Sequence, residues 1–167
     1  MQQQYHHFEY GESLARRLKA ISHTDTQQQF YRATEVEELS ELNARLSSAS
    51  GMILVAIDGN NSDFGWKNSD SLMERPQYFF MVAKQTVSGD TDTVFTAQQE
   101  CAAIVRQIIA RMVRDHQRYD SGMTYLDESS FTARGVGPIG ENFYGVILGF
   151  NMDVGLDCRI DQTCWNE

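Results

Sequence analysis

Four oxygen-bearing side chains stand close together at Asp58, Asn60, Ser62 and Asp63, in the manner of the opening of a calcium-binding loop. Such a loop also needs glycine at its sixth position and glutamate at its twelfth. Asp63 and Ser69 occupy those two positions, so the pattern favours a polar turn after a strand. Asp58 and Asp63 remain candidate contacts for a protein partner.

Three glycines, Gly135, Gly137 and Gly140, have the G-x-G-x-x-G spacing of a dinucleotide-binding motif. That motif needs a strand before it and a helix after it, because the helix N-terminus holds the pyrophosphate. Here a strand pattern follows, and Pro138 stands in the middle of the motif. The spacing therefore predicts a hairpin turn.

The histidines do not form a metal-ligand set. His6 and His7 are adjacent and would point apart on a helix, while His23 and His116 each stand alone. No G-x-S-x-G elbow, no phosphate-binding loop and no Cys–His pair in a recognisable context occurs. We expect no catalytic residue, no metal and no cofactor.

Two large aromatic residues, Phe64 and Trp66, lie in the polar, glycine-containing stretch Asp58–Ser71, which reads as a long loop. Aromatic side chains in such a loop commonly anchor a protein interface, and they can equally fold back as a lid over the core. Trp165, in the polar C-terminal stretch, poses the same alternative.

The strongest helical pattern runs from Thr96 to Arg118. Apolar residues recur there at steps of three and four, which places on one stripe Cys101, Ile104, Val105, Ile108, Ile109, Met112 and Val113. Thr96 and Gln99 have the spacing of a capping box. We expect this helix to cover a sheet and Cys101 to act as a small core hydrophobe.

Apolar runs predict strands at Met52–Ile57, Pro76–Val87, Ser130–Val136 and Tyr144–Val154. In the last of these, apolar residues alternate strictly with other types, and Gly145 and Gly149 lie on the opposite face. Because glycine weakens a strand interior, either another backbone comes close there or the strand bends.

Two further helices are expected before the first strand, at Gly11–Ile21 and from Thr34 to Leu46, with a polar loop at His23–Gln29 between them. The whole order predicts an α+β fold, with an antiparallel sheet of about four strands and helices packed mainly on one face. Residues 1–167 form one domain in this interpretation. It has an N-terminal helical arm at about 1–33 and a polar C-terminal tail at about 156–167.

The net charge of −9 is concentrated in residues 119–167, which hold eight acidic and two basic side chains. Such a chain is a poor candidate for binding nucleic acid through its phosphates, although an acidic surface can repel DNA that slides past it. No apolar run approaches the roughly 20 residues of a membrane span, so a soluble protein without membrane contact is expected. Cys158 and Cys164 are expected to be free thiols.

The succession of helix, strand, long loop, strand, helix and glycine-containing hairpin (Ser130–Val154) resembles tail-terminator and head-to-tail connector proteins of tailed bacteriophages. The match in layout covers roughly residues 34–155. The resemblance implies a structural, non-enzymatic subunit of a homo-oligomeric ring in the neck or tail of a virion. Its partners would be neighbouring neck, tail or portal proteins, and DNA would only pass through the lumen. Asp58–Ser71 and Tyr119–Ser129 would then contact other subunits.

Two alternatives stay open at this point. One is a small cytoplasmic α+β protein that binds a ligand or catalyses a reaction in a pocket beside Asp58–Ser71. The other is an adaptor that binds a single protein through Phe64 and Trp66. The candidate interface residues are Asp58, Asp63, Phe64, Trp66, Gly145, Gly149 and Trp165.

Overall fold

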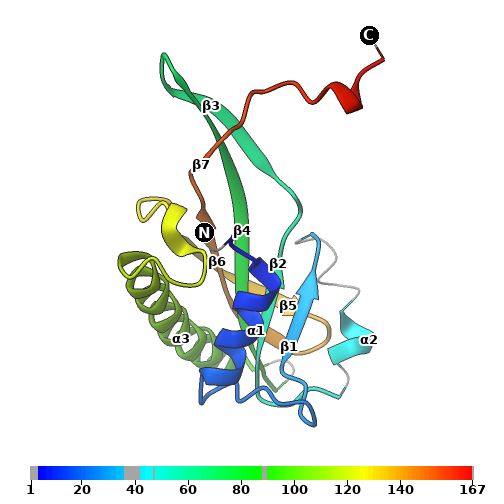
Figure 1. Ribbon diagram of the computed structural model, residues 1–167. Helices are drawn as coiled ribbons and strands as arrows, with labels where there is room; N and C mark the ends of the chain where they lie inside the picture. Colours follow the sequence, from blue (N-terminus) through cyan, green and yellow to red (C-terminus); the bar gives the residue numbers. More distant parts are fainter. Residues whose placement is uncertain (1–3, 36–41, 47, 88–89, 167) are drawn as a thin grey trace.

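The structure, a computed structural model, describes residues 4–35, 42–46, 48–87 and 90–166 (Figure 1). Its helices are α1 (His7–Arg17), α2 (Asn43–Leu46) and α3 (Thr91–Gln117), with 3₁₀ turns at Met123–Tyr125 and Gln162–Cys164. Its strands are β1 (Phe30–Ala33), β2 (Met52–Ile57), β3 (Ser62–Asn68), β4 (Ser71–Gln85), β5 (Thr132–Ile139), β6 (Phe143–Asn151) and β7 (Val154–Gly155).

These strands form one mixed sheet of seven strands, in the order β1-β2-β4-β6-β5, with β3 and β7 also paired to β4. β1 and β2 are parallel, and the other pairs are antiparallel. The expectation of an antiparallel sheet of about four strands is therefore wrong. Two of the additional strands, β1 and β3, form in segments that we expected to be loop or helix.

β4 organises the sheet because it belongs to two parts of the molecule. Its second half, Gln77–Gln85, pairs with β6 in the centre of the body. Its first half, Ser71–Pro76, pairs with β3 in a hairpin that projects from the body (Figure 1). The expected strand Pro76–Val87 therefore begins five residues earlier than predicted, and half of the expected long loop Asp58–Ser71 is strand β3.

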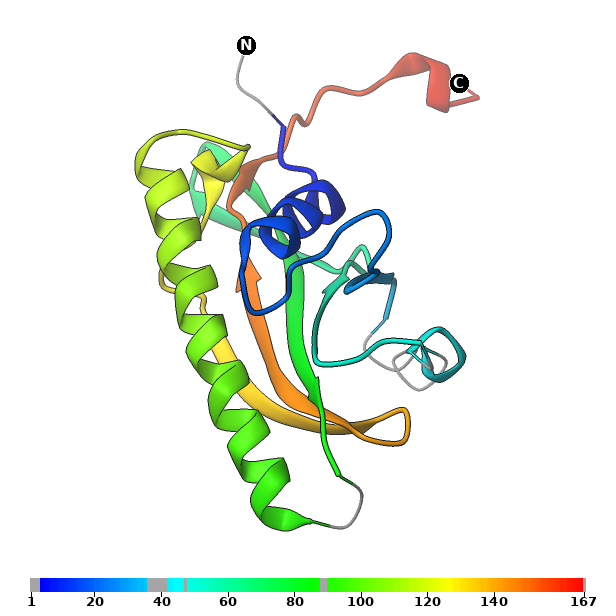
Figure 2. The ribbon, with the colours of Figure 1, turned by 90° about the horizontal axis from the view of Figure 1, so that it is seen from below.

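Both faces of the sheet are covered. α1 and α3 pack on one face, against alternate residues of the central strands such as Leu54, Phe80 and Leu148. On the opposite face, Leu46 of α2 joins a second core cluster with Ile53. Figure 2 shows α3 and α2 on opposite sides of the sheet. The expectation that helices lie mainly on one face is therefore wrong, because both sides of β2 and β6 are apolar and both need cover.

α3 is the predicted central helix, but it begins one turn earlier than the sequence pattern suggested. The side chain of Asp90 accepts hydrogen bonds from the backbone N–H groups of Asp92 and Thr93, at 3.0 and 3.4 Å. Asp90 is thus the N-cap, and the expected capping box at Thr96 and Gln99 is wrong. Cys101 is fully buried in the apolar stripe, as predicted.

The N-terminal region differs more from expectation. α1 begins at His7, one turn before the predicted start at Gly11. His7 and Tyr10 of this additional turn are buried on the same side as Leu14. β1 occupies Phe30–Ala33, where a helical arm was expected. Of the helix expected from Thr34 to Leu46, the structure shows α2, and residues 36–41 lie outside the described part of the chain.

A close backbone approach accounts for the glycine at position 145. A side-chain Cβ there would overlap the carbonyl of Val82 and the Cα of Ala83 in the neighbouring strand β4. At Gly149 a Cβ would meet the hydroxyl of Thr132 at 2.8 Å and the ring of Phe79 at 3.0 Å. Both glycines are buried within the sheet, where the strands of this chain surround them.

Candidate protein-interaction surface

The projecting hairpin carries an apolar surface built from three strands, which we call the hairpin face. Directly paired residues of neighbouring antiparallel strands share a face of the sheet. Leu72 of β4 is paired with Trp66 of β3, and its carbonyl accepts a hydrogen bond from the N–H of Leu156, just after β7. One residue pair further in, Glu74 stands between Phe64 and Val154. The hairpin face comprises Phe64, Trp66, Leu72, Glu74, Val154 and Leu156.

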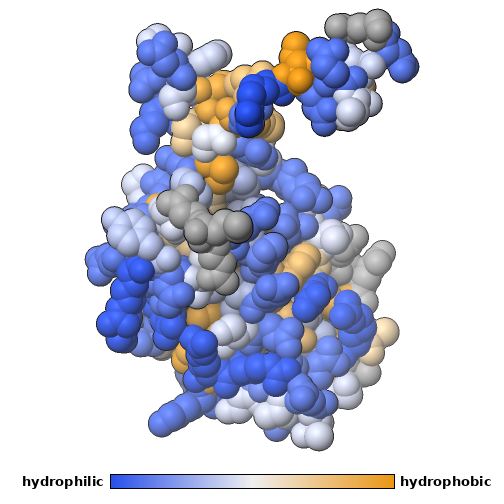
Figure 3. All heavy atoms as spheres, viewed as in Figure 1, coloured by the Kyte–Doolittle hydropathy of each residue, from blue (hydrophilic) through white to orange (hydrophobic). Residues whose placement is uncertain are grey.

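The two aromatic residues of this surface point into solvent. Phe64 is 63% exposed and Trp66 is 64% exposed. The alternative that they fold back as a lid over the core is therefore wrong. Figure 3 shows hydrophobic residues gathered on the hairpin between its polar tip and the body. Large apolar surfaces that remain exposed in this way commonly mark a contact with another molecule.

Polar contacts hold the hairpin in register. The hydroxyl of Ser62 donates to Oε1 of Glu74 at 2.8 Å, across β3 and β4. Nε of Arg75 donates to Oδ1 of Asp153 at 3.1 Å, which joins β4 to the segment before β7. Each such surface contact contributes little stability alone, but together they fix how the apolar side chains are presented.

A cavity of about 270 Å³ lies at the base of the hairpin, and we call it the basal cavity. It continues the hairpin face, because Glu74 and Val154 belong to both. The remaining wall residues are Gln4, Tyr5, Pro76, Tyr78, Gly122, Tyr125 and Met152. Three tyrosines and a methionine make this a site suited to an aromatic or aliphatic side chain.

An aromatic cluster around His7 supports the cavity from below. The imidazole stacks on Tyr78 and Phe80, with ring centroids 4.8 and 4.5 Å apart. Its Nδ1 accepts from the hydroxyl of Tyr5 at 2.8 Å, and its Nε2 donates to the carbonyl of Phe79 at 3.0 Å. Burial lowers the pKa of His7 to about 4, so the ring is neutral near pH 7. His7 is thus part of the core.

The C-terminal arm, residues 156–166, leaves the body beside the hairpin face and stands away from it in both ribbon views (Figures 1 and 2). Ile160 is 65% exposed and Trp165 is 60% exposed. Beyond Leu156, the hydrogen bonds of the arm within the described chain join arm residues to one another, for example Arg159 to Asp157. Cys158 and Cys164 are exposed free thiols, as expected.

The acidic candidates of the sequence lie near the start of the hairpin. Oδ1 of Asp58 accepts the backbone N–H of Asn60 at 3.0 Å, in a tight turn after β2. Asp63 is exposed on β3, and its Oδ2 accepts from Nε2 of Gln77 at 3.4 Å. Asp63 and Phe64 are successive residues of β3, so their side chains lie on opposite faces of the hairpin. Among residues that the structure describes, no group of three acidic, histidine or cysteine side chains could hold a metal ion.

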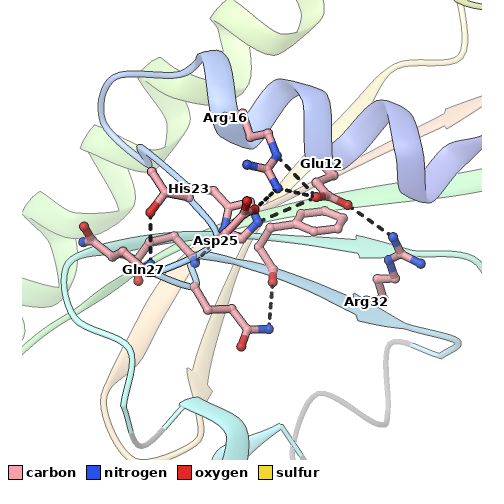
Figure 4. A network of polar contacts seen from close by, with 10 residues as sticks. Glu12, Arg16, His23, Asp25, Gln27 and Arg32 are labelled. Carbon is pink, nitrogen blue, oxygen red and sulfur yellow. Dashed lines mark hydrogen bonds and ion pairs between the residues drawn. The ribbon is translucent and has the colours of Figure 1, made fainter.

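A second polar cluster lies on the outer surface of α1 (Figure 4). Glu12 contacts Arg16 at 2.9 Å and Arg32 at 3.3 Å, and Arg16 also contacts Asp25 at 2.6 Å. The hydrogen bond from Arg16 lowers the pKa of the Glu12 carboxyl. Nε2 of His23 lies 3.9 Å from Glu12, and its Nδ1 accepts a backbone N–H, so the ring is held in place. This cluster ties α1 to the following loop and to β1.

Sequence reasoning found Phe64, Trp66 and Trp165, but it missed Leu72, Val154 and Leu156. Phe64 and Trp66 stand two residues apart in a segment where apolar and other residues alternate, and this alternation could have indicated strand β3. The three missed residues join the surface only because β4 pairs with β3 and β7. Leu72 and Leu156 are far apart in the sequence, so no local sequence pattern could reveal that they are neighbours.

Comparisons of this chain with protein-family models, with curated proteins and with solved structures give no match. Within the described ranges, no helix has both the length and the apolar character needed to cross a membrane.

Proposed function

We propose that this chain is a non-enzymatic structural subunit that assembles with further copies of itself, and that the hairpin face forms part of the contact between subunits. The assembly we propose is a homo-oligomeric ring in the neck or tail of a tailed bacteriophage, without a cofactor. The phage setting derives its support from the resemblance in element order described above. The self-assembly derives its support from the surface of the hairpin and arm.

The observation that carries the proposal is the exposed aromatic area at one end of the molecule. Phe64, Trp66 and Trp165 are each at least 60% exposed. Since a buried aromatic side chain removes roughly 150–250 Å² from water, these three together offer about 300–450 Å² of apolar area. The apolar part of one side of a standard protein interface is about 450 Å². A contact that uses both the hairpin and the arm would therefore approach the apolar area of one side of a standard interface.

A stacked ring also needs contacts with its neighbours above and below. A second exposed apolar pair, Val87 and Phe95, lies at the other end of β4 and at the start of α3. β4 has 15 residues, so this pair is separated from the hairpin tip by roughly 50 Å. Two separate apolar surfaces suit a subunit with two kinds of protein neighbour, and we assign Val87 and Phe95 to an adjoining neck, tail or portal protein.

The charge of the chain agrees with a passage for DNA. The net charge is −9, and an acidic lumen would repel the phosphates rather than hold them. DNA would therefore pass through the ring without being bound.

The assembly state of the purified protein tests the proposal. Light scattering on a sizing column, with negative-stain images of the peak, should show a closed ring. A ring that forms only on a neighbouring phage component should be recovered when candidate neck or portal rings are added. A protein that remains monomeric up to high concentration, alone and with such rings, would contradict the proposal.

The basal cavity supports one second candidate, a ligand-binding protein. Its walls would suit a small, flat apolar molecule of a size that fits about 270 Å³. In that case a ligand screen should raise the melting temperature of a monomer, because binding to the folded state stabilises it. Ring formation without any ligand would favour the structural subunit instead.

A further inference from the structure

We infer that the C-terminal arm of one copy lies in the basal cavity of a neighbouring copy, with Trp165 as its anchor. This inference rests on the proposed self-assembly, and it names the segment and the site that make the contact. The partner is thus a second copy of this chain, and the contact joins two different surfaces.

The arm has the properties of a segment that binds to another molecule. It carries Ile160 and Trp165 with most of their surface in water. Short-range hydrogen bonds form within it, such as those from the backbone N–H groups of Arg159 to Asp157 and of Thr163 to Asp161. These bonds shape the arm before it meets a partner, which lowers the entropic cost of binding.

The basal cavity offers a matching receptor. Tyr5, Tyr78 and Tyr125 present rings against which an indole can pack, and Met152 offers a polarisable thioether. At the rim, the carboxylate of Glu74 can accept a hydrogen bond from the indole N–H, since its Oε1 already accepts from Ser62 and a carboxylate has further acceptor positions. Tryptophan combines this large apolar body with one donor.

The arm of the same chain runs the wrong way to fill this cavity. It leaves the sheet at Leu156, which is bonded to Leu72 towards the outer end of the hairpin. The cavity lies in the opposite direction along β4, at Pro76 and Tyr78. In the structure the arm continues away from the hairpin and the body, so its own Trp165 stays outside the cavity (Figure 1). Extended, its eleven described residues reach about 35 Å, far enough for a neighbouring subunit.

This arrangement also accounts for closure into a ring. The donating arm and the receiving cavity are different surfaces of the subunit, so each copy can give one arm and receive another. Contacts of this head-to-tail kind generate rings when the rotation closes. Glu74 and Val154 belong to both the cavity and the hairpin face, so the incoming arm would also cover part of the hairpin face.

Two full-length variants test the inference by complementation. Ile160→Ser/Trp165→Ser removes the anchors from the arm, and Tyr125→Arg places a charge on a partly exposed wall of the cavity, outside the hairpin face. Each variant alone should bind its own copies at least about 30-fold more weakly than the unmodified protein. An equimolar mixture should form a one-to-one complex, since one variant retains the cavity and the other retains the arm. Cys164→Ser, at an exposed position beside Trp165, is the control and should assemble normally.

The outcomes separate the two proposals. If the unmodified protein assembles and Ile160→Ser/Trp165→Ser assembles equally well, self-assembly stands and the inference about the arm is overturned. If both variants are folded monomers by circular dichroism and their mixture stays monomeric, the arm and the cavity do not meet, and the inference is again overturned. An unmodified protein that never assembles overturns both proposals.

Cross-linking gives an independent readout. A benzophenone amino acid at position 165, in a mixture of light and isotope-labelled protein, should cross-link light arms to labelled peptides that contain Tyr125 or Met152. Cross-links confined to a single chain would show that the arm folds back on its own cavity, and would overturn the inference.

Discussion

The hydroxyl of Tyr10 donates a 2.9 Å hydrogen bond to the carboxylate of Asp115, which is 2% exposed. This bond joins α1 to α3 across the core. Nε of Arg111 donates to the same oxygen, also at 2.9 Å, so the buried carboxylate has both a cationic and a neutral donor. Burial raises the pKa of the Tyr10 hydroxyl, which therefore remains a donor at ordinary pH.

Replacing Tyr10 by Phe should accordingly destabilise the protein. The change removes one donor from a buried charge, and a hydrogen bond to a charged group contributes about 1.5–3 kcal/mol. Urea unfolding followed by circular dichroism should show a loss of this size. Tyr119→Phe, at a highly exposed position, should leave the free energy of unfolding unchanged. A Tyr10→Phe variant as stable as the unmodified chain would mean that Arg111 alone satisfies Asp115.

His7 should make stability depend on pH between about 6.5 and 4. The pKa of His7 is lowered to about 4 in the folded state, from 6.5 in the unfolded chain. As the pH falls below 6.5, the unfolded state binds a proton that the folded state does not, so the free energy of unfolding falls. The full loss amounts to about 3 kcal/mol and is complete near pH 4.

This contribution can be isolated by substitution. His7→Gln should be less stable at pH 7, and the difference between it and the unmodified protein should shrink as the pH falls to 4. His6→Gln, at the exposed neighbouring position, is the matched control and should leave the stability at pH 7 unchanged. A His7→Gln variant whose pH profile runs parallel to that of the unmodified protein would contradict the assignment.

Gly145 should tolerate no side chain. Ala at this position would press its Cβ into the backbone of Val82 and Ala83, and overpacking of this kind costs about 1–3 kcal/mol. Gly65→Ala, in the projecting hairpin, is the control, because no atom lies within 4 Å of the added Cβ. In a thermal unfolding experiment, Gly145→Ala should have a lower melting temperature than the unmodified protein, and Gly65→Ala should have nearly the same one. Equal melting temperatures would show that β4 and β6 can separate locally at little cost.

The N-cap of α3 provides a direct contrast between two capping positions. Asp90→Ala should cost about 1 kcal/mol, because two backbone N–H groups lose their acceptor. Thr96→Ala should cost far less, since Thr96 lies within the helix and does not cap it. Chemical denaturation of both variants measures the two losses in the free energy of unfolding. A larger loss for Thr96→Ala would restore the start of the helix that the sequence suggested.

The hairpin face should act in assembly and not in folding. Phe64→Ser/Trp66→Ser removes its two exposed aromatic residues and should weaken self-association at least about 30-fold. The circular dichroism spectrum and the melting temperature should stay unchanged, because both side chains already lie in water. Lys67→Ser on the same strand is the control for a change at the hairpin surface. Normal assembly of the aromatic double variant would remove the hairpin face from the interface.

The elements that could be predicted from the sequence are those whose apolar pattern repeats over many residues. The stripe of α3 and the alternation of β6 each repeat over many residues, and both elements were found with errors only at their ends. β1 has four residues, too few for a period to be recognised. The polar composition of β3 predicts a loop, while pairing with β4 in fact decides its structure. Both misses led to the wrong sheet.

The candidate surface was predictable only in part, for a related reason. Large aromatic residues in a polar segment stand out by type, which is how Phe64, Trp66 and Trp165 were found. Leu72 and Val154 look like ordinary strand residues, and their role depends on a register that joins positions about 80 residues apart. That information lies in the three-dimensional pairing and not in any short stretch of the chain.

The continuity of β4 has a mechanical consequence. The projecting hairpin and the body share one strand, since β4 runs from the hairpin tip into the centre of the sheet. A pull on the tip is therefore transmitted along one backbone to β2 and β6, which hold it by hydrogen bonds loaded in shear. In the proposed assembly, a load on the hairpin would therefore reach the central strands of the sheet directly.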